Sequence, residues 1–359
     1  MKLRALCLVL ALHSAPSLAA DLFLPDPFQA VQMALRYYQM AAIAGDAEAQ
    51  TKMGWLFEQG MGVGKDLGEA AKWYERAASQ NEPNGLYNLG LLFLKGRGVV
   101  PDAERAAKLM TGAAELNLAA AQSQLAVMHE KGIGVPVSQE LSVFWMRKAA
   151  ELGDVPAQNN LGIKYAYGQG VAVNYPEAVK WFTQAAEAGN AEAQGNLGLI
   201  YKDGLGGVKQ DLLAAANWLA LAGSQGHVAS QNRLARMFEQ GQGLQKNMNE
   251  AARWYQMAAD AGDIDASTHM GWLYESGALG NAANGKPDFA AALKWYRRGA
   301  AGNDASAQNH LGRFYRDGIG VDQNEAEALA WFKKAADQGD AKARVNLEQM
   351  NEKQTGRRK

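Results

Sequence analysis

Histidines and clustered carboxylates are the side chains in this sequence that could bind a metal or move a proton. Four histidines follow residue 20, and no two of them have the paired helical spacing of a zinc-binding motif. Asp260, Asp263 and Asp265 crowd one segment, but the glycine and terminal glutamate of a calcium loop are missing. The sequence therefore predicts no metal site, and we interpret the three aspartates as helix caps.

Motifs for covalent or cofactor chemistry are also missing. Neither Gly-x-Ser-x-Gly nor Ser-x-x-Lys occurs, and the single cysteine, Cys7, lies close to the N-terminus. The run Gly60-Met61-Gly62-Val63-Gly64 superficially resembles a phosphate-binding loop. The same turn recurs along the chain without a preceding strand, so the context of a dinucleotide site is lacking. We predict no catalytic residues and no cofactor.

A pattern of about 36 residues accounts for most of the chain. Its clearest copies are AKWYERAA from residue 71, VKWFTQAA from residue 179 and ARWYQMAA from residue 252. Apolar residues occur twice per unit at helical spacing, so each unit is predicted to be a helix–turn–helix. Two short helices cannot enclose a core, and neighbouring units must therefore stack. The predicted fold is all-α: a right-handed α-solenoid of about eight repeats with half-repeat caps.

Glycine is abundant, at 39 of 359 residues, and it occurs at fixed phases of the repeat. One phase contains only glycine or asparagine, the residues that most readily adopt the left-handed conformation closing a helix. We predict helix ends at this phase: Gly45, Asn81, Asn117, Gly153, Gly189, Gly226, Gly262, Asn303 and Gly339.

The two ends of the chain differ from the repeats. Lys2 and Arg4 precede a short apolar run and a small-residue exit at Ala20, which is typical of a secretory signal. The predicted divisions are a signal peptide at 1–20, an N-terminal capping helix at 21–44, eight repeats at 45–339, a C-terminal capping helix at 340–350 and a basic, disordered tail at 351–359.

The repeat resembles a known family. The pattern Ala-Gln-x-x-Leu-Gly-x-x-Tyr-x-x-Gly-x-Gly, followed by Ala-x-x-Trp-Tyr-x-x-Ala-Ala, is similar to the SEL-1-like repeat, a relative of the tetratricopeptide repeat. The resemblance is clearest from Gly153 to Gly170 and from Gly189 to Gly206, and it spans roughly residues 34–350. It implies an interaction scaffold and places the first helix of each unit on the concave side of the stack.

A ladder of side chains follows this expected concave face. Each first helix has a small central residue, such as Gly54 or Ala126, and the ladder takes the positions two before and one after it. These positions lie on one helical face. The candidate partner-binding residues are Lys52, Trp55, Asn88, Gln124, Asn160, Asn196, Arg233, Arg236, His269, Trp272, His310 and Arg313, beside the aliphatic Leu91, Val127, Ile163 and Leu199.

Two interpretations of this ladder stay open. Amides beside apolar residues suit an extended peptide, but the amides could equally bond neighbouring repeats while the tryptophans fill gaps between helices. Arginine and histidine replace the amides from the sixth repeat on, so we hypothesise a preference there for acidic or aromatic ligands. A five-residue insertion around residues 280–287 of the seventh repeat is either an alternative binding site or a tolerated variation in loop length, and the second is favoured because lengthening a surface loop costs little free energy.

The resulting functional expectation is an exported, periplasmic or secreted scaffold that binds a protein or peptide. The net charge of −1 favours no nucleic-acid partner, and no integral membrane segment is predicted. The oligomeric state is open, with a monomer expected. The resemblance implies a complex for polysaccharide export, motility or signalling. The alternatives are a secreted virulence factor that binds a host protein and, as a different class, a β-lactam or cell-wall hydrolase.

Overall fold

The computed structural model describes residues 27–279 and 285–357, and every regular element in these ranges is a helix. Eight of the nine helices that open a repeat are thirteen-residue or twelve-residue segments that begin after a capping residue. These first helices are α3 (Ala47–Gln59), α5 (Pro83–Lys95), α7 (Ala119–Lys131), α9 (Val155–Tyr167), α11 (Ala191–Asp203), α13 (Val228–Gln240), α15 (Ile264–Glu275), α17 (Ala305–Asp317) and the longer α19 (Ala341–Arg357).

The second helices alternate with the first. A short 3₁₀ turn, η1 (Leu205–Gly207), interrupts the loop after α11. The second helices are α2 (Pro27–Ile43), which has no first helix before it among the described residues, and α4 (Leu67–Ser79), α6 (Ala103–Glu115), α8 (Gln139–Glu151), α10 (Tyr175–Glu187), α12 (Leu212–Ser224), α14 (Met248–Asp260), α16 (Phe289–Ala301) and α18 (Glu325–Asp337).

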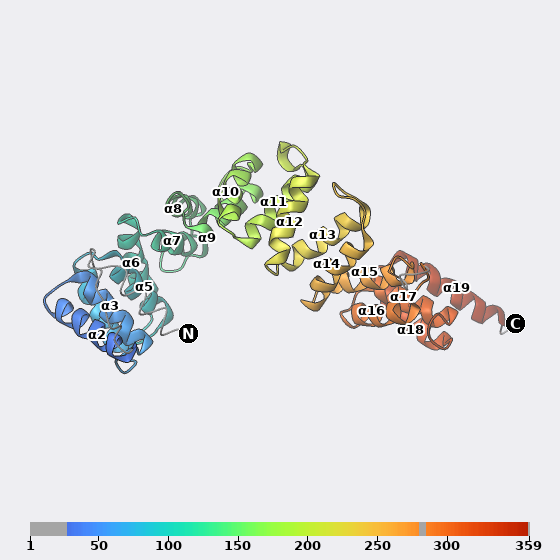
Figure 1. The fold of residues 1–359 in the computed structure, drawn as a ribbon, viewed down its shortest axis with the longest axis horizontal. Coiled ribbons are helices and arrows are strands. Elements are labelled where there is room, and N and C mark those ends of the chain that lie inside the picture. The colour runs from blue at the N-terminus through green and yellow to red at the C-terminus, as the bar shows by residue number, and fades with distance from the viewer. Residues whose placement is uncertain (1–26, 280–284, 358–359) are drawn as a thin grey trace, which may run out of the picture. The chain divides into compact units, whose positions relative to one another are not determined.

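Helices pack in successive pairs, as Figure 1 shows from blue to red. In both units a first helix packs on the second helix of its own repeat, for example α3 on α4 and α11 on α12, and a second helix packs on the first helix of the next repeat, for example α4 on α5 and α12 on α13. The chain divides into two compact units inside α10, at Trp181 and Phe182, and both units are built in this way. The predicted all-α solenoid is confirmed.

Large aromatic side chains pack beneath glycines in the core of several repeats. Tyr74 and Tyr296 on the second helices are fully buried, at 0% exposure. A Cβ atom added to Gly54 would lie 2.6 Å from the ring of Tyr74, and one added to Gly271 would lie 2.6 Å from that of Tyr296. The glycine at the centre of these first helices therefore lets the two helices of a repeat approach closely.

The predicted helix ends occur where expected. All nine residues of the glycine and asparagine phase have a positive φ angle, including Asn303 at 68°. Side chains other than asparagine and aspartate rarely adopt this conformation. Because a positive φ reverses the chain after each second helix, this phase sets the register of the stack.

Buried glutamines join consecutive helices. Gln122 is 1% exposed, and its amide nitrogen donates a hydrogen bond of 2.9 Å to the carbonyl oxygen of Ala114 at the end of α6. Gln194 donates in the same way to Ala186, at 3.0 Å, and its own oxygen accepts from Gln225, at 2.8 Å. Leu86 takes this position in the second repeat, so the site accommodates an apolar side chain of similar size.

This arrangement predicts different costs for the same substitution in two repeats. We expect Gln194→Leu to lower the free energy of unfolding by about 2 kcal/mol, because it removes two hydrogen bonds, the one from Gln194 to the Ala186 carbonyl and the one from Gln225 to Gln194. Gln122→Leu should cost less, since its buried side-chain oxygen has no partner among the described residues and its removal relieves a penalty. Urea denaturation followed by circular dichroism measures both. Equal losses would contradict the argument.

The ends of the chain agree only in part with the predicted divisions. Helix α2 fits the N-terminal cap, whereas residues 1–26, including the expected signal peptide, lie outside the described residues. Helix α19 continues to Arg357, so the prediction of a disordered tail from residue 351 is wrong for residues 351–357. Those residues contain no proline and no glycine before Gly356, and nothing in them stops the helix that begins at Ala341. No described helix is both long and apolar enough to cross a membrane.

Candidate ligand-binding face

The ladder residues all lie on first helices, and first helices of adjacent repeats contact one another: α3 with α5, α11 with α13, and α15 with α17. Their side chains are half-buried, apart from the more exposed Asn160 and Trp272. The predicted positions therefore follow one another within each of the two units of the chain. A polar side chain that already forms a hydrogen bond or ion pair within the chain is less free to bind a ligand, so the partners of each ladder residue decide which of them can do so.

In the N-terminal unit the amides of the ladder are unengaged. The side chains of Asn88, Gln124 and Asn160 make no hydrogen bond with any residue that the structure describes. Lys52 likewise has no ion pair within the described chain. Trp55 behaves differently, because it packs against the apolar cores of its own and the following repeat. The amides of this unit fit the ligand-binding interpretation, and Trp55 fits the gap-filling one.

In the C-terminal unit most of the cationic ladder is paired with carboxylates of adjacent repeats. Arg236 forms an ion pair of 2.5 Å with Asp265 on the next first helix and a hydrogen bond of 3.2 Å with Asn232. Burial alone would raise the pKa of Asp265, but hydrogen bonds from Asn232 and Arg236 outweigh it and lower the pKa. Arg236 therefore contributes to the contact between the sixth and seventh repeats.

The two ladder histidines stack on buried tyrosines. The rings of His269 and Tyr255 are 4.9 Å apart and nearly parallel, and Glu239 accepts from both the Tyr255 hydroxyl and His269 Nδ1, at 3.2 Å for the histidine. Burial and the bond to Glu239 raise the pKa of Tyr255. The pKa of Glu239 is lowered, because these hydrogen bonds outweigh its own burial.

The next repeat contains the same arrangement with one more cation. His310 stacks on Tyr296 with ring centroids 4.4 Å apart, and its Nδ1 lies 2.9 Å from Glu275. Arg313 adds an ion pair of 3.2 Å to the same carboxylate. Burial of Glu275 raises its pKa, but the hydrogen bonds from His310 and Tyr296 and the charges of His310 and Arg313 prevail and lower it to about 2. His310 and Arg313 thus hold adjacent repeats together.

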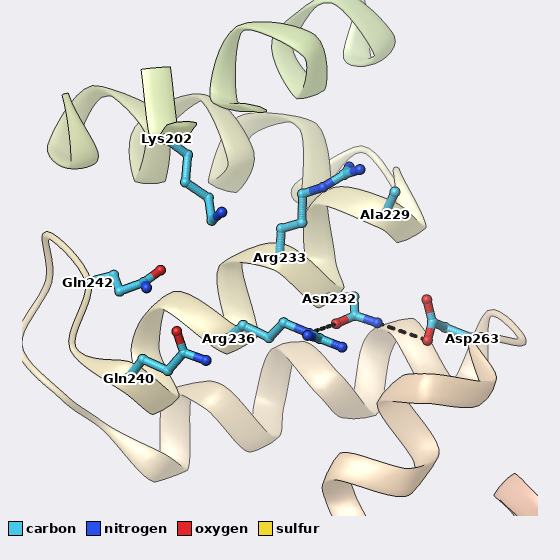
Figure 2. Close-up of a pocket in the computed structure, with 8 residues that line it drawn as sticks. All are labelled: Lys202, Ala229, Asn232, Arg233, Arg236, Gln240, Gln242 and Asp263. Carbon is cyan, nitrogen blue, oxygen red and sulfur yellow. Dashed lines mark hydrogen bonds between the residues drawn. The ribbon is translucent and has the colours of Figure 1, made fainter. Parts of the chain in front are cut away.

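Arg233 is the exception among these cations. Its guanidinium has no hydrogen bond or ion pair with any described residue. Its charge acts on His227, whose pKa is lowered first by burial and then by Arg233. Arg233 lines a pocket of about 430 Å³ together with Lys202 and Arg236, which Figure 2 shows.

Trp272, whose exposed fraction is 39%, lines a second pocket of about 300 Å³. Its lining includes the carboxylates of Glu239, Asp265 and Asp304 as well as the two histidines. In the C-terminal unit, a pocket lined by three cations is therefore followed by one lined by three carboxylates. Asn196, the remaining ladder residue of this unit, is half-buried on α11.

Sequence reasoning missed a series of links between repeats. In several repeats a polar residue directly before the first ladder position of a helix bonds the capping residue of the next first helix. Thr51 bonds Glu82 at 2.5 Å, Ser123 bonds Asp154 at 3.2 Å, and Thr268 bonds Asp304 at 2.9 Å. For Thr51 and Ser123 the signal that could have revealed the link is a Gln-Thr or Gln-Ser pair with an acidic cap 31 residues later, whereas Thr268 follows a serine and its cap comes 36 residues later.

The three crowded aspartates also have different roles. Asp263 caps α15 by accepting from the backbone nitrogen of Ala266 at 2.7 Å, as predicted. Asp265 instead pairs with Arg236, and Asp260 pairs with Arg298 at 3.1 Å, so the cap prediction is wrong for these two. Within residues 27–279 and 285–357, no three metal-ligating side chains are arranged to hold a metal ion.

Comparison with known proteins gives the family. The model of the Sel1 repeat matches nine successive stretches: residues 28–46, 47–82, 83–118, 119–154, 155–190, 191–227, 228–263, 264–304 and 305–340. The chain belongs to the Sel1-repeat family. The first stretch coincides with the half-repeat of α2, and the other eight with the predicted full repeats. No curated protein matches the chain.

Two solved structures of Sel1-repeat proteins are similar over most of the chain. A protective antigen present in uropathogenic Escherichia coli strains, which displays the same repeat fold, is 33% identical over 90% of this chain and 68% of its own, with a TM-score of 0.79. A Sel1 repeat protein from Oxalobacter formigenes is 29% identical over 98% of this chain and 100% of its own, with a TM-score of 0.65. Sel1-repeat solenoids typically mediate protein–protein interaction.

Proposed function

We propose that this Sel1-repeat protein is an exported scaffold, working in the periplasm or outside the cell, that binds a protein or peptide through its first-helix face and has no catalytic activity. The observation that carries the proposal is that several polar side chains on this face make no hydrogen bond or ion pair within the described chain. Asn88, Gln124 and Arg233 have no partner among the described residues, although the polar residues directly before Gln124 and Arg233 bond the next repeat. A side-chain amide that has no partner within the protein and lies beside aliphatic residues can form hydrogen bonds with the backbone of an extended segment.

Charge reversal along the ladder must take the internal ion pairs into account. Arg236→Glu would place a carboxylate against Asp265, and Arg313→Glu would place one against Glu275. Both variants should weaken the stack itself, so a loss of binding in them says nothing about a partner. Arg233 has no such pair, which makes it the suitable position for reversal in the C-terminal unit.

Site-specific crosslinking in cells tests the proposal. We expect a photoreactive residue at Gln124 on α7 to capture a stoichiometric partner from the envelope fraction, because that amide faces the proposed contact. The matched control places the same residue at Lys108, an exposed position on the second helix α6. Capture from Lys108 but not from Gln124 would show that the partner binds another face. Turnover of a cell-wall or β-lactam substrate by purified protein would contradict the non-catalytic assignment.

A second candidate is a secreted factor that contacts a host protein. It is favoured by the likeness to the protective antigen present in uropathogenic Escherichia coli strains. The same crosslinking experiment distinguishes the two, since the captured protein is then of host origin.

A further inference from the structure

The pocket beside Arg233 contains several polar groups without partners. Besides the Arg233 guanidinium, the side-chain amides of Gln240 and Gln242 make no hydrogen bond with any described residue. Gln240 ends α13, and Gln242 lies in the turn that follows it. In Figure 2 these two amides lie on one side of Arg236, and Asp263 lies on the other. Three polar side chains without a partner, Arg233, Gln240 and Gln242, thus line one cavity.

The charges around the cavity fit a single negative group. Lys202 is paired with Asp203 at 2.8 Å, and Arg236 is paired with Asp265 at 2.5 Å. Arg233 alone among the three lining cations has no carboxylate. A ligand with one negative charge would complete the pairing, because an unpaired guanidinium binds a carboxylate through two parallel hydrogen bonds.

A more highly charged ligand fits less well. The carboxylate of Asp263 lines the cavity, and that of Asp265 lies behind Arg236, so a phosphate dianion would meet two like charges at close range. The dianion of a phosphate monoester has no hydrogen to donate, and the Asp263 carboxylate can only accept, so the two cannot form a hydrogen bond with each other. A peptide group offers both a donor and an acceptor, which suits the Gln240 and Gln242 amides as well as Asp263.

We infer that this pocket, formed by α11, α13 and the turn after α13, binds an aspartate or glutamate side chain carried by an extended segment of the protein partner. The side-chain carboxylate pairs with Arg233, and Lys202 and Arg236 add longer-range attraction. The amides of Gln240 and Gln242 bond the peptide backbone on either side. The inference rests on the proposed function, which it deepens by assigning a specificity pocket to the C-terminal unit.

The experiment uses the purified full-length protein on an array of blocked nonapeptides with randomised flanks and one fixed central residue. The centres are glutamate, aspartate, glutamine, lysine and phosphoserine. We expect glutamate-centred and aspartate-centred peptides to retain about tenfold more protein than glutamine-centred ones, the usual effect of one charge-assisted contact. Arg233→Gln should reduce this preference to less than about twofold.

A matched variant guards against a general charge effect. Arg253→Gln also removes one positive charge, from an exposed position on α14 where Arg253 lies 3.6 Å from Glu250 and over the ring of Trp254, away from the pocket. This variant should keep the wild-type preference. Circular dichroism of both variants excludes a loss of fold as the cause of a change.

Three results would overturn the inference. One is stronger retention on phosphoserine than on glutamate, together with competition by millimolar inorganic phosphate, which would make the pocket a phosphate site. Another is equal retention on glutamate, glutamine and lysine. The third is a preference that survives in Arg233→Gln. In each case a partner captured at Gln124 would leave the proposed scaffold function standing, so the two failures are distinguishable.

Discussion

Gly271→Ala should destabilise the protein by about 3 kcal/mol, although it adds a single methyl group to a helix. The new Cβ atom would lie 2.6 Å from two ring carbons of Tyr296, whereas carbon atoms in contact need about 3.5 to 4 Å. Tyr296 cannot move aside, because its ring is fully buried between Gly271 and the stacked imidazole of His310, and its hydroxyl is bonded to Glu275. The two helices of the seventh repeat must therefore separate.

Gly112→Ala is the matched control and should have the opposite sign. Gly112 lies inside α6, and a Cβ atom there would meet Leu86 at 3.5 Å, an ordinary contact. Replacing glycine by alanine in a helix then stabilises the protein by about 0.5–1 kcal/mol. Urea midpoints measured by circular dichroism for the two variants give the comparison. A Gly271→Ala variant as stable as the wild type would show that the stack adapts more readily than its packing suggests.

The fold could be predicted from sequence because its determinants are local. Helix ends at Asn303 and its equivalents depend on one residue each, and the repeated spacing of Trp and Tyr identifies the face that must be buried. Eight copies of one pattern also average out the exceptions, such as Leu86 in place of glutamine. The end of α19 was predicted less well, since no neighbouring copy marks where the last helix should stop.

The candidate site was harder to predict from sequence, because the hydrogen bonds of a ladder side chain depend on residues of other repeats. Nothing next to His310 in the sequence indicates that it stacks on Tyr296 and bonds Glu275, which belong to the preceding repeat. A recurring signal does exist: a glutamate four residues after the small central residue, with a tyrosine on the following helix, as in Glu58 and Tyr74. It predicts a bonded carboxylate in the core, but whether the next repeat supplies histidine, arginine or lysine decides which ladder residue is engaged.

The group around Glu275 predicts a loss of stability in acid. The pKa of this carboxyl is about 2 in the folded protein, against an ordinary value of 4.5. Between these values the unfolded chain binds a proton that the folded chain does not, so this stabilising contribution is complete above pH 4.5 and is lost as the pH falls towards 2. From the shift, the contribution is on the order of 3 kcal/mol.

Glu275→Gln should therefore lower the free energy of unfolding by about 2–3 kcal/mol at pH 7 and flatten its decline between pH 4.5 and pH 2.5. The amide keeps the size of the side chain and can still accept from Tyr296, but it has no charge to pair with His310 and Arg313. Tyr296→Phe removes one hydrogen-bond donor to Glu275 and should give an intermediate dependence of stability on pH.

Glu104→Gln, at an exposed position of α6, serves as the charge control. Urea denaturation at several pH values measures these profiles. If Glu275→Gln declined as steeply in acid as the wild type, the acid sensitivity would have to come from other carboxylates, and the pairing of Glu275 with His310 and Arg313 would contribute little to the contact between the seventh and eighth repeats.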